Sequence, residues 1–273
     1  MRIHHLNCGT MCPRSARLIN GEGGWLAPGK IVCHCLLIES GDGLLLVDTG
    51  VASMTEHRPL GRVFAPMRPI NDRAETALAQ IEALGYSASD VRHLVMTHLD
   101  GDHTGGLRDF PEADVHVFAP ELAAALEPEL RDRARYGDAN WEHGPRWVRH
   151  EVDDEQWFGF ESARILPELD FEMRLVPLVG HTRGHSGVAI EMGDGWLLHC
   201  GDACFHHGDR AIPPYCPAGL RAFQRLAAAD NGSRVASQER LRELAARRDD
   251  VRMFCSHDPH DLEVAQAAAA AAT

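Results

Sequence analysis

The sequence lacks several features that would assign it to a large class of proteins. It contains no long cluster of Lys or Arg, and its formal net charge is −13 with His neutral. Neither nucleic acid nor a membrane is therefore an expected partner, because both attract basic surfaces. No run of 18 apolar residues occurs, and residues 1–20 contain no uninterrupted apolar segment of the kind that directs export. We therefore expect a cytoplasmic protein.

Cysteine occurs eight times, but in no pattern that predicts a disulfide framework or a zinc finger. Without an export segment, the thiols are expected to stay reduced. Cys8 and Cys12, like Cys33 and Cys35, are close enough in sequence to suggest metal-binding pairs. Because no second pair with finger-like spacing accompanies them, we interpret these four residues as small, buried, apolar side chains. No G-x-S-x-G segment is present either, so the sequence predicts no serine nucleophile of that type.

The composition is that of an ordinary globular protein, with 44% apolar and 25% charged residues in 273 positions. We predict a single domain over residues 1–273. Apolar runs predict strands at 31–38, 44–48, 91–97, 113–119, 174–180, 186–192, 195–202 and 251–256. Helices are predicted at 72–84, from Pro120 onward, at 217–229, at 234–247 and at the C-terminus. A charged, aromatic-rich insert is predicted at 127–170. This alternation favours an α/β fold with helices outside two sheets.

Acidic residues and histidines gather where predicted strands end. The densest group is in "MTHLDGDHTGG", residues 96–106, where no Lys or Arg balances His98, Asp100, Asp102 and His103. Four more strand ends carry such a residue: Asp48, His181 in "GHTRGHSG", Asp202 in "HCGDA" and His257 in "CSHDP". Imidazole and carboxylate are ligands of borderline divalent metals, so these loops predict a metal site if the fold brings the strand ends together.

The loop from His98 to His103, followed by "TGG", resembles the HxHxDH signature of the metallo-β-lactamase superfamily. The elements "LLLVDTG", "GHTRGHS", Asp202 and His257 match that family in the same order, over roughly residues 31–260. The resemblance implies an αββα four-layer sandwich of two mixed sheets with a dinuclear metal site at one edge. It further implies that His98, His181 and Asp202 hold one metal, and that Asp102, His103 and His257 hold the other, with Asp202 shared.

Asp100 departs from the family pattern, because a second histidine usually occupies its position. Three interpretations stay open: Asp100 binds the first metal, it orients a ligand or water, or the first metal site is empty or weak. The flavo-diiron branch of the family has a glutamate at this position, so a carboxylate is compatible with a metal. Two divalent cations are expected as cofactors, with zinc favoured and iron or manganese as alternatives that carboxylate ligands suit.

The remaining candidates are assigned supporting roles. Asp48 is expected to bond to loop backbone or to a ligand histidine, as metal sites require. His185 is expected to be structural rather than a ligand, and Cys200 to be a packing residue. The other histidines considered are expected to pack, to face solvent or to line the pocket mouth: His93, His116, His206 and His207.

The function that the resemblance implies is hydrolysis by a metal-bound hydroxide acting on a small-molecule ester, with a lactone favoured. Asp102 is the candidate catalytic residue, because it could steer the hydroxide and pass a proton to the leaving group. The closest branch is that of the acyl-homoserine-lactone hydrolases. The alternatives are a thioester hydrolase of the glyoxalase II type, a diiron redox or oxygen-handling protein, and a metabolite sensor. Pocket walls are expected from Trp25, 51–70 and 136–160, and a homodimer is compatible with the sequence.

Overall fold

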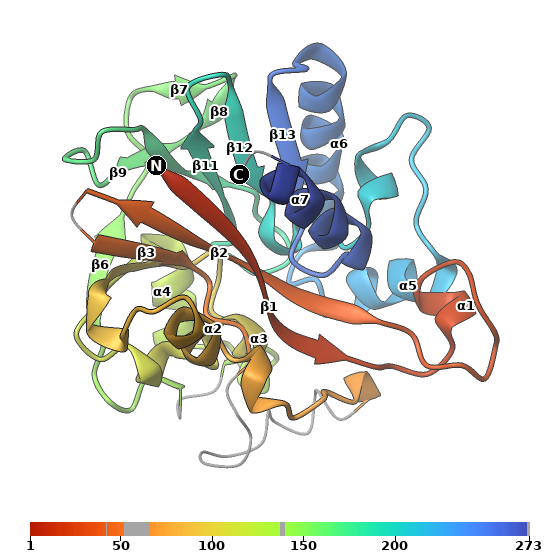
Figure 1. Cartoon of the computed structure of the whole chain (residues 1–273). Helices are drawn as coiled ribbons and strands as arrows, with labels where there is room; N and C mark the ends of the chain where they lie inside the picture. Colours follow the sequence, from red (N-terminus) through yellow and green to blue (C-terminus); the bar gives the residue numbers. More distant parts are fainter. Residues whose placement is uncertain (42, 52–65, 137–139, 272–273) are drawn as a thin grey trace.

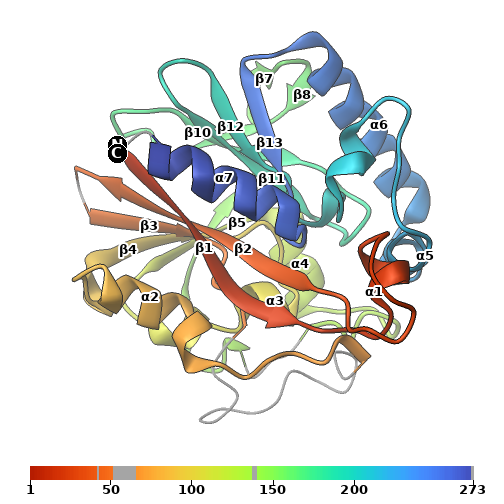
Figure 2. The same ribbon diagram turned by 45° about the vertical axis from the view of Figure 1, so that its right-hand side comes forward.

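Two β-sheets face each other in this protein, and helices cover their outer faces (Figures 1 and 2). The computed structural model describes residues 1–41, 43–51, 66–136 and 140–271. This α/β sandwich confirms the predicted fold class. None of the helices in the described residues combines the length and the apolar character that crossing a bilayer requires.

The first sheet has six strands in the order in which they occur along the chain. They are β1 (Arg2–Met11), β2 (Ile31–Ser40), β3 (Gly43–Val47), β4 (Val91–Val95), β5 (Asp114–Phe118) and β6 (Arg146–His150). The strands β1 to β3 are antiparallel to their neighbours, whereas β3 to β6 run parallel to one another. The parallel strands therefore have their carboxyl ends at the same edge of the sheet.

The second sheet has five strands in the order β13-β12-β11-β10-β9. They are β9 (Ala163–Ile165), β10 (Met173–Pro177), β11 (Ser186–Glu191), β12 (Trp196–His199) and β13 (Val251–Phe254). Only the β12–β13 pair is parallel. A small separate sheet pairs β7 (Gln156–Trp157) with β8 (Phe160–Glu161).

The central strands are apolar on both faces because both faces are covered. Leu36 and Leu45 point between the sheets and pack with Leu175 and Val188 of the second sheet. Their neighbours along β2 and β3, such as Leu37, point to the opposite side, where helices cover them. Alternation of side chains on a strand produces this arrangement, and continuous apolar runs are typical of strands buried on both sides.

Helices cover the outer faces of both sheets. Their bounds are α1 (Ala16–Ile19), α2 (Ala77–Ala83), α3 (Gly101–Thr104), α4 (Ala119–Leu126), α5 (Ala218–Ala227), α6 (Asn231–Arg247) and α7 (Pro259–Ala271). The helices α2 and α4 pack on the first sheet, and α6 packs on the second through Leu241 and Leu244. The last helix, α7, lies against β1 and β2.

The structure differs from the predicted elements in three places. The strand β1 was not predicted, because its histidines and polar residues hide its apolar alternation. The helix predicted at 72–84 begins only at Ala77, since Thr76 is extended and accepts a hydrogen bond from the Ala79 amide. The aromatic-rich segment 127–170 contributes β6 to the first sheet and β9 to the second, so it belongs to the sandwich itself.

Candidate metal centre

The acidic and histidine loops meet at one edge of the sandwich because of the strand directions. Asp48 follows β3, and the segment that begins at His98 follows β4, which runs parallel to β3. Asp202 follows β12 and His257 follows β13, and these two strands are parallel as well. The turn between β10 and β11 carries His181. The convergence that the sequence required is therefore present.

One group of candidate ligands brings together His98, His181 and Asp202, whose ligand atoms lie within 4.8 Å of one another. The Nε2 atom of His181 lies 3.3 Å from Asp202 Oδ2, and that of His98 lies 3.8 Å from the same oxygen. Asp100 Oδ2 lies 3.0 Å from His181 Nε2 and 3.5 Å from His98 Nε2. Ligands of one tetrahedral zinc ion lie roughly 3.3–3.6 Å apart. We call these four residues the first site.

A second group shares Asp202 with the first. Asp202 Oδ1 lies 3.4 Å from His103 Nε2, and Asp202 Oδ2 lies 3.1 Å from His257 Nε2. Asp102 Oδ2 lies 3.5 Å from the same nitrogen of His257. We call Asp102, His103, His257 and Asp202 the second site. The carboxylate of Asp202 faces both sites, which is the position that a bridging ligand requires.

The two histidines of the second site are held by hydrogen bonds to their other ring nitrogens. His103 Nδ1 lies 2.8 Å from Asp48 Oδ2, and His257 Nδ1 lies 2.7 Å from the carbonyl oxygen of Val32. The backbone amide and the hydroxyl of Thr97 both donate to Asp48. Burial raises the pKa of the Asp48 carboxyl, but the charge and hydrogen bond of His103 outweigh it and bring the pKa to about 2. Asp48 thus has the supporting role that was predicted.

The atoms of these sites fit divalent cations. The buried Nε2 atoms of His98 and His103 and the Oδ1 atom of Asp202 have no hydrogen-bond partner among the described residues. Unpaired buried polar atoms are costly, so a group of them aimed at one place needs a partner. Because the atoms are imidazole nitrogens and carboxylate oxygens, a divalent cation such as zinc would be that partner.

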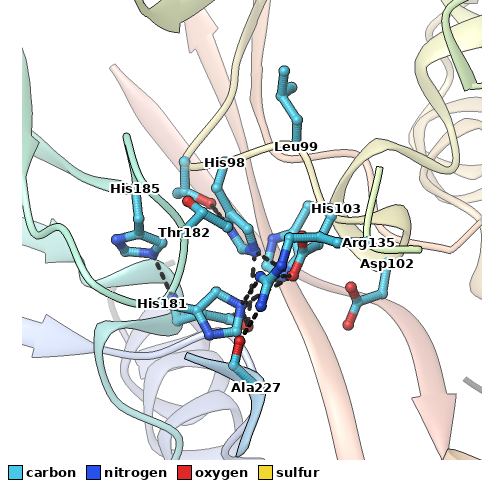
Figure 3. A network of polar contacts seen from close by, with 12 residues as sticks. His98, Leu99, Asp102, His103, Arg135, His181, Thr182, His185 and Ala227 are labelled. Carbon is cyan, nitrogen blue, oxygen red and sulfur yellow. Dashed lines mark hydrogen bonds and ion pairs between the residues drawn. The ribbon is translucent and has the colours of Figure 1, made fainter. Parts of the chain in front are cut away.

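Arg135 lies directly against the first site (Figure 3). The sequence did not predict this position for Arg135. Its Nη1 atom donates to Asp100 Oδ2 at 2.7 Å and lies 3.2 Å from His181 Nε2, while Nη2 donates to the carbonyl oxygen of Ala227. Burial raises the pKa of the Asp100 carboxyl, but Arg135 and the neighbouring histidines hold it well below its usual value. Asp100 is therefore an anion paired with a cation at this edge.

His185 supports Asp202 and is not a member of either site. Its Nδ1 lies 3.0 Å from the carbonyl oxygen of Leu178, and its Nε2 accepts the backbone amide of Asp202 at 2.8 Å. Burial keeps the pKa of His185 well below its ordinary value, so the ring is neutral. A Cβ at Gly201 would lie 2.5 Å from His185 Nε2, which explains the glycine there. The predicted structural role agrees with these contacts.

Glu121, at the start of α4, is a second residue that the sequence analysis missed. It is fully buried, and Oε1 accepts the Leu99 amide at 2.9 Å. Its Oε2 accepts the Thr182 hydroxyl at 2.6 Å and the Gly184 amide at 3.0 Å. The carboxylate thereby joins the loop of His98 to the loop of His181. Its spacing from the buried Ala125, four positions later on the same helical face, was the available signal.

A cavity of about 470 Å³ opens at both sites. Asp100, Asp102, His181, Asp202 and His257 contribute to its wall together with Arg135. The apolar part of the wall includes Met11, Ile31, Met67, Phe205, Phe223 and Leu226. Small-molecule sites combine an apolar wall with a few convergent polar groups in this way. Among the described residues, those that line the cavity include no tryptophan.

The predicted walls are therefore only partly where the sequence placed them. Met67 belongs to the predicted segment 51–70, of which 52–65 lies outside the described residues. Trp25 is exposed, and Trp157 is buried against Trp196 with their ring centroids 5.5 Å apart. The tryptophans of the aromatic-rich segment pack on the sandwich. The residues of that segment that line the cavity are instead Arg131, Asp132, Ala134 and Arg135.

The other candidates lie away from both sites, with one exception. His93, His116 and His150 form a hydrogen-bonded row across β4, β5 and β6. His206 and His207 lie beside Asp258, and they are not among the described residues that line the cavity. Cys200 is a packing residue of the second sheet, as predicted. The exception is Cys33, a free and buried thiol whose sulfur lies within 4.8 Å of ligand atoms of Asp102 and His257.

Comparison with known proteins gives this arrangement a family. A model described as the metallo-beta-lactamase superfamily matches residues 28–257. The chain belongs to the metallo-beta-lactamase superfamily. A relative in Mycobacterium tuberculosis, named a probable metallo-hydrolase, is 43% identical over 97% of this chain and 83% of its own length. An N-acyl homoserine lactonase of Azorhizobium caulinodans is 26% identical over 95% of this chain and 94% of its own.

Solved structures of the superfamily share the fold of this member. An N-acyl homoserine lactone hydrolase with the product N-hexanoyl-L-homoserine at its metal centre has a TM-score of 0.71. It is 20% identical and covers 96% of this chain, which covers 95% of that one. A dizinc lactonase with a similar product has a TM-score of 0.64 and 16% identity, covering 94% of this chain and 87% of its own. The sandwich of this superfamily member is thus that of known lactonases.

Proposed function

We propose that the protein is a dinuclear metal-dependent hydrolase that opens small-molecule lactones carrying an acyl chain. The observation that carries the proposal is a set of buried imidazole and carboxylate atoms that no described residue pairs, beside a cavity whose remaining wall is largely apolar. Membership of the superfamily supports hydrolysis, and the lactonases among the relatives support a lactone.

The first and second sites would hold the two cations, with Asp202 between them. Two divalent cations held by these sites would supply acidity to water and would polarise a substrate oxygen. The proton transfers would be carried out by side chains of the protein. Asp102 lines the cavity, and its carboxylate is the group proposed to take a proton from water. It would return that proton to the alkoxide that leaves when the ring C–O bond breaks.

The apolar wall suits the acyl part of such a substrate. Phe205 and Phe223 lie with their ring centroids 5.7 Å apart and both line the cavity. Leu226, on the same helix as Phe223, is largely exposed and also lines the cavity. An acyl chain there would bury apolar surface on both partners, at roughly 0.8 kcal/mol for each methylene.

The experiment is a substrate panel with zinc-loaded protein. It contains N-acyl homoserine lactones of increasing chain length and an S-acyl thioester of matched chain. We expect the lactones to be opened with higher kcat/KM than the thioester. We also expect kcat/KM to increase with chain length in the wild type. Thioester cleavage without lactone opening would instead support the glyoxalase II type of activity.

Two variants connect the panel to the structure. His103→Ala removes a ligand of the second site, and turnover of every substrate should fall to background. Phe223→Ala removes apolar wall, so KM for the longest chain should rise about tenfold, while the shortest chain changes little. Phe223→Leu is the matched control, because it keeps an apolar side chain of intermediate size. Equal effects of Phe223→Ala on all chain lengths would contradict the assignment of the wall.

A further inference from the structure

The two sites differ in how freely their ligand atoms can accept a cation. Both sites contain ligand atoms that have no hydrogen-bond partner among the described residues: His98 Nε2 in the first site, and His103 Nε2 and Asp202 Oδ1 in the second. The difference lies in a guanidinium. In the first site, Arg135 Nη1 already donates to Asp100 Oδ2 and lies within 3.2 Å of His181 Nε2. A cation entering the first site must therefore displace contacts of the guanidinium, whereas no guanidinium of a described residue contacts the ligand atoms of the second site.

The positive charge of Arg135 also opposes the binding of a cation at the first site. An arginine remains protonated under all physiological conditions, and its side chain is 14% exposed, so solvent screens it poorly. Its positive charge cancels the negative charge that Asp100 adds to the first site. Arg135 Nη2 is also bound to the Ala227 carbonyl at the end of α5, which holds the guanidinium in place. The first site thus carries a fixed cation close to the position of its metal.

We propose that Arg135 and Asp100 form a charge-compensated pair that makes the first site the weaker of two unequal metal sites. The second site would fill first and retain its metal, and the first site would exchange it. Arg135 is then a positioning residue that acts on the metal through Asp100 and His181. The proposal rests on the proposed function, because it assumes that the cluster binds two cations.

The test is a titration of metal-free protein with Zn²⁺, followed by calorimetry or by competition with a chromogenic chelator. The wild type should bind zinc in two steps whose dissociation constants differ by about 100-fold or more. His181→Ala should keep only the tight step, and His257→Ala only the weak step. These two variants assign each step to its site without any measurement of activity.

Arg135→Gln should tighten the weak step by about tenfold or more and leave the tight step unchanged. Arg131→Gln is the matched control, because Arg131 lines the same cavity but pairs with Asp132 and the Ala229 carbonyl rather than with a candidate ligand. It should change neither step. A weak step that becomes weaker in Arg135→Gln, or that does not change, would overturn the proposal, since Arg135 would then support zinc binding at the first site or have no effect on it.

Arg135→Gln leaves Asp100 unpaired. If this variant folds poorly, a second pair of variants tests the proposal. Asp100→His places an imidazole beside the guanidinium and should abolish the weak step. Asp100→His combined with Arg135→Gln removes the cation and should restore two steps; failure to restore the weak step overturns the proposal. Equal affinity of both sites in the wild type would overturn the inference alone. Absence of any zinc binding would overturn the proposed function with it.

Discussion

Glu121→Gln tests how the two ligand loops are held together. The carboxylate accepts two backbone amides, one on each oxygen: Leu99 on Oε1 and Gly184 on Oε2. A glutamine has one carbonyl oxygen and one NH₂ group. In either orientation, its NH₂ group must face one of these amides. The hydroxyls of Thr182 and Tyr136 can rotate to accept a bond, but an amide N–H cannot.

The expected loss of stability follows from the number of backbone amides that lose their acceptor. One buried backbone N–H is left without an acceptor, which costs about 1–3 kcal/mol of unfolding free energy. The assay is urea unfolding of metal-free protein, with Glu82→Gln on the exposed side of α2 as the matched control. Surface substitutions of that kind change stability by less than about 0.5 kcal/mol. If Glu121→Gln changed stability no more than Glu82→Gln, the carboxylate would not be joining the loops.

Two further outcomes are expected elsewhere in the fold. Gly184→Ala should lower the thermal unfolding midpoint, because its Cβ would lie 2.1 Å from the Glu121 amide nitrogen. Gly41→Ala should not, because no described residue lies within 4 Å of the added Cβ. Burial, followed by His150 and His93, lowers the pKa of His116 to about 3. The unfolded chain protonates this histidine near pH 6.5, whereas the folded protein keeps it neutral. The contribution of the neutral imidazole to folding stability is therefore present above that pH and is lost as the pH falls toward 3. In urea unfolding at pH 7, 6 and 5, His116→Gln should reduce the slope of stability against pH by up to about 1.4 kcal/mol per unit; an unchanged slope would contradict the assignment.

The strand-end clusters could be predicted because each depends on local sequence. A predicted strand that ends at Asp48 or His98 is visible in the local sequence. The later residues Asp202 and His257 occur in the order that the family pattern has, which predicts that they join the same metal site. The same holds for the sandwich, since residues 35–38 and 44–47, around Leu36 and Leu45, are apolar at every position. The strand β1 escaped prediction because its polar histidines are satisfied by long-range contacts, such as that of His5 with His34 at 2.8 Å.

Glu121 and Arg135 could not be found in the same way, because their roles depend on contacts between distant segments. Arg135 lies in a charged stretch whose local pattern predicts a solvent-exposed loop, yet it reaches Asp100, 35 positions earlier. Cys33 was interpreted as a packing residue, and it is indeed buried. Only the fold shows that its sulfur lies beside Asp102 and His257. Pairings across such separations are set by topology and not by spacing.

The most direct test of the metal-dependent function is the rate of lactone opening as zinc is returned to protein stripped by a chelator. The stripped protein should be inactive, and the rate should rise with bound zinc, while protein carrying Asp202→Asn stays inactive at every zinc concentration. Asp202 is the residue that contacts both sites. A stripped protein that opens the lactone at the full rate would contradict the account, as would a zinc-loaded protein that opens no lactone in the panel.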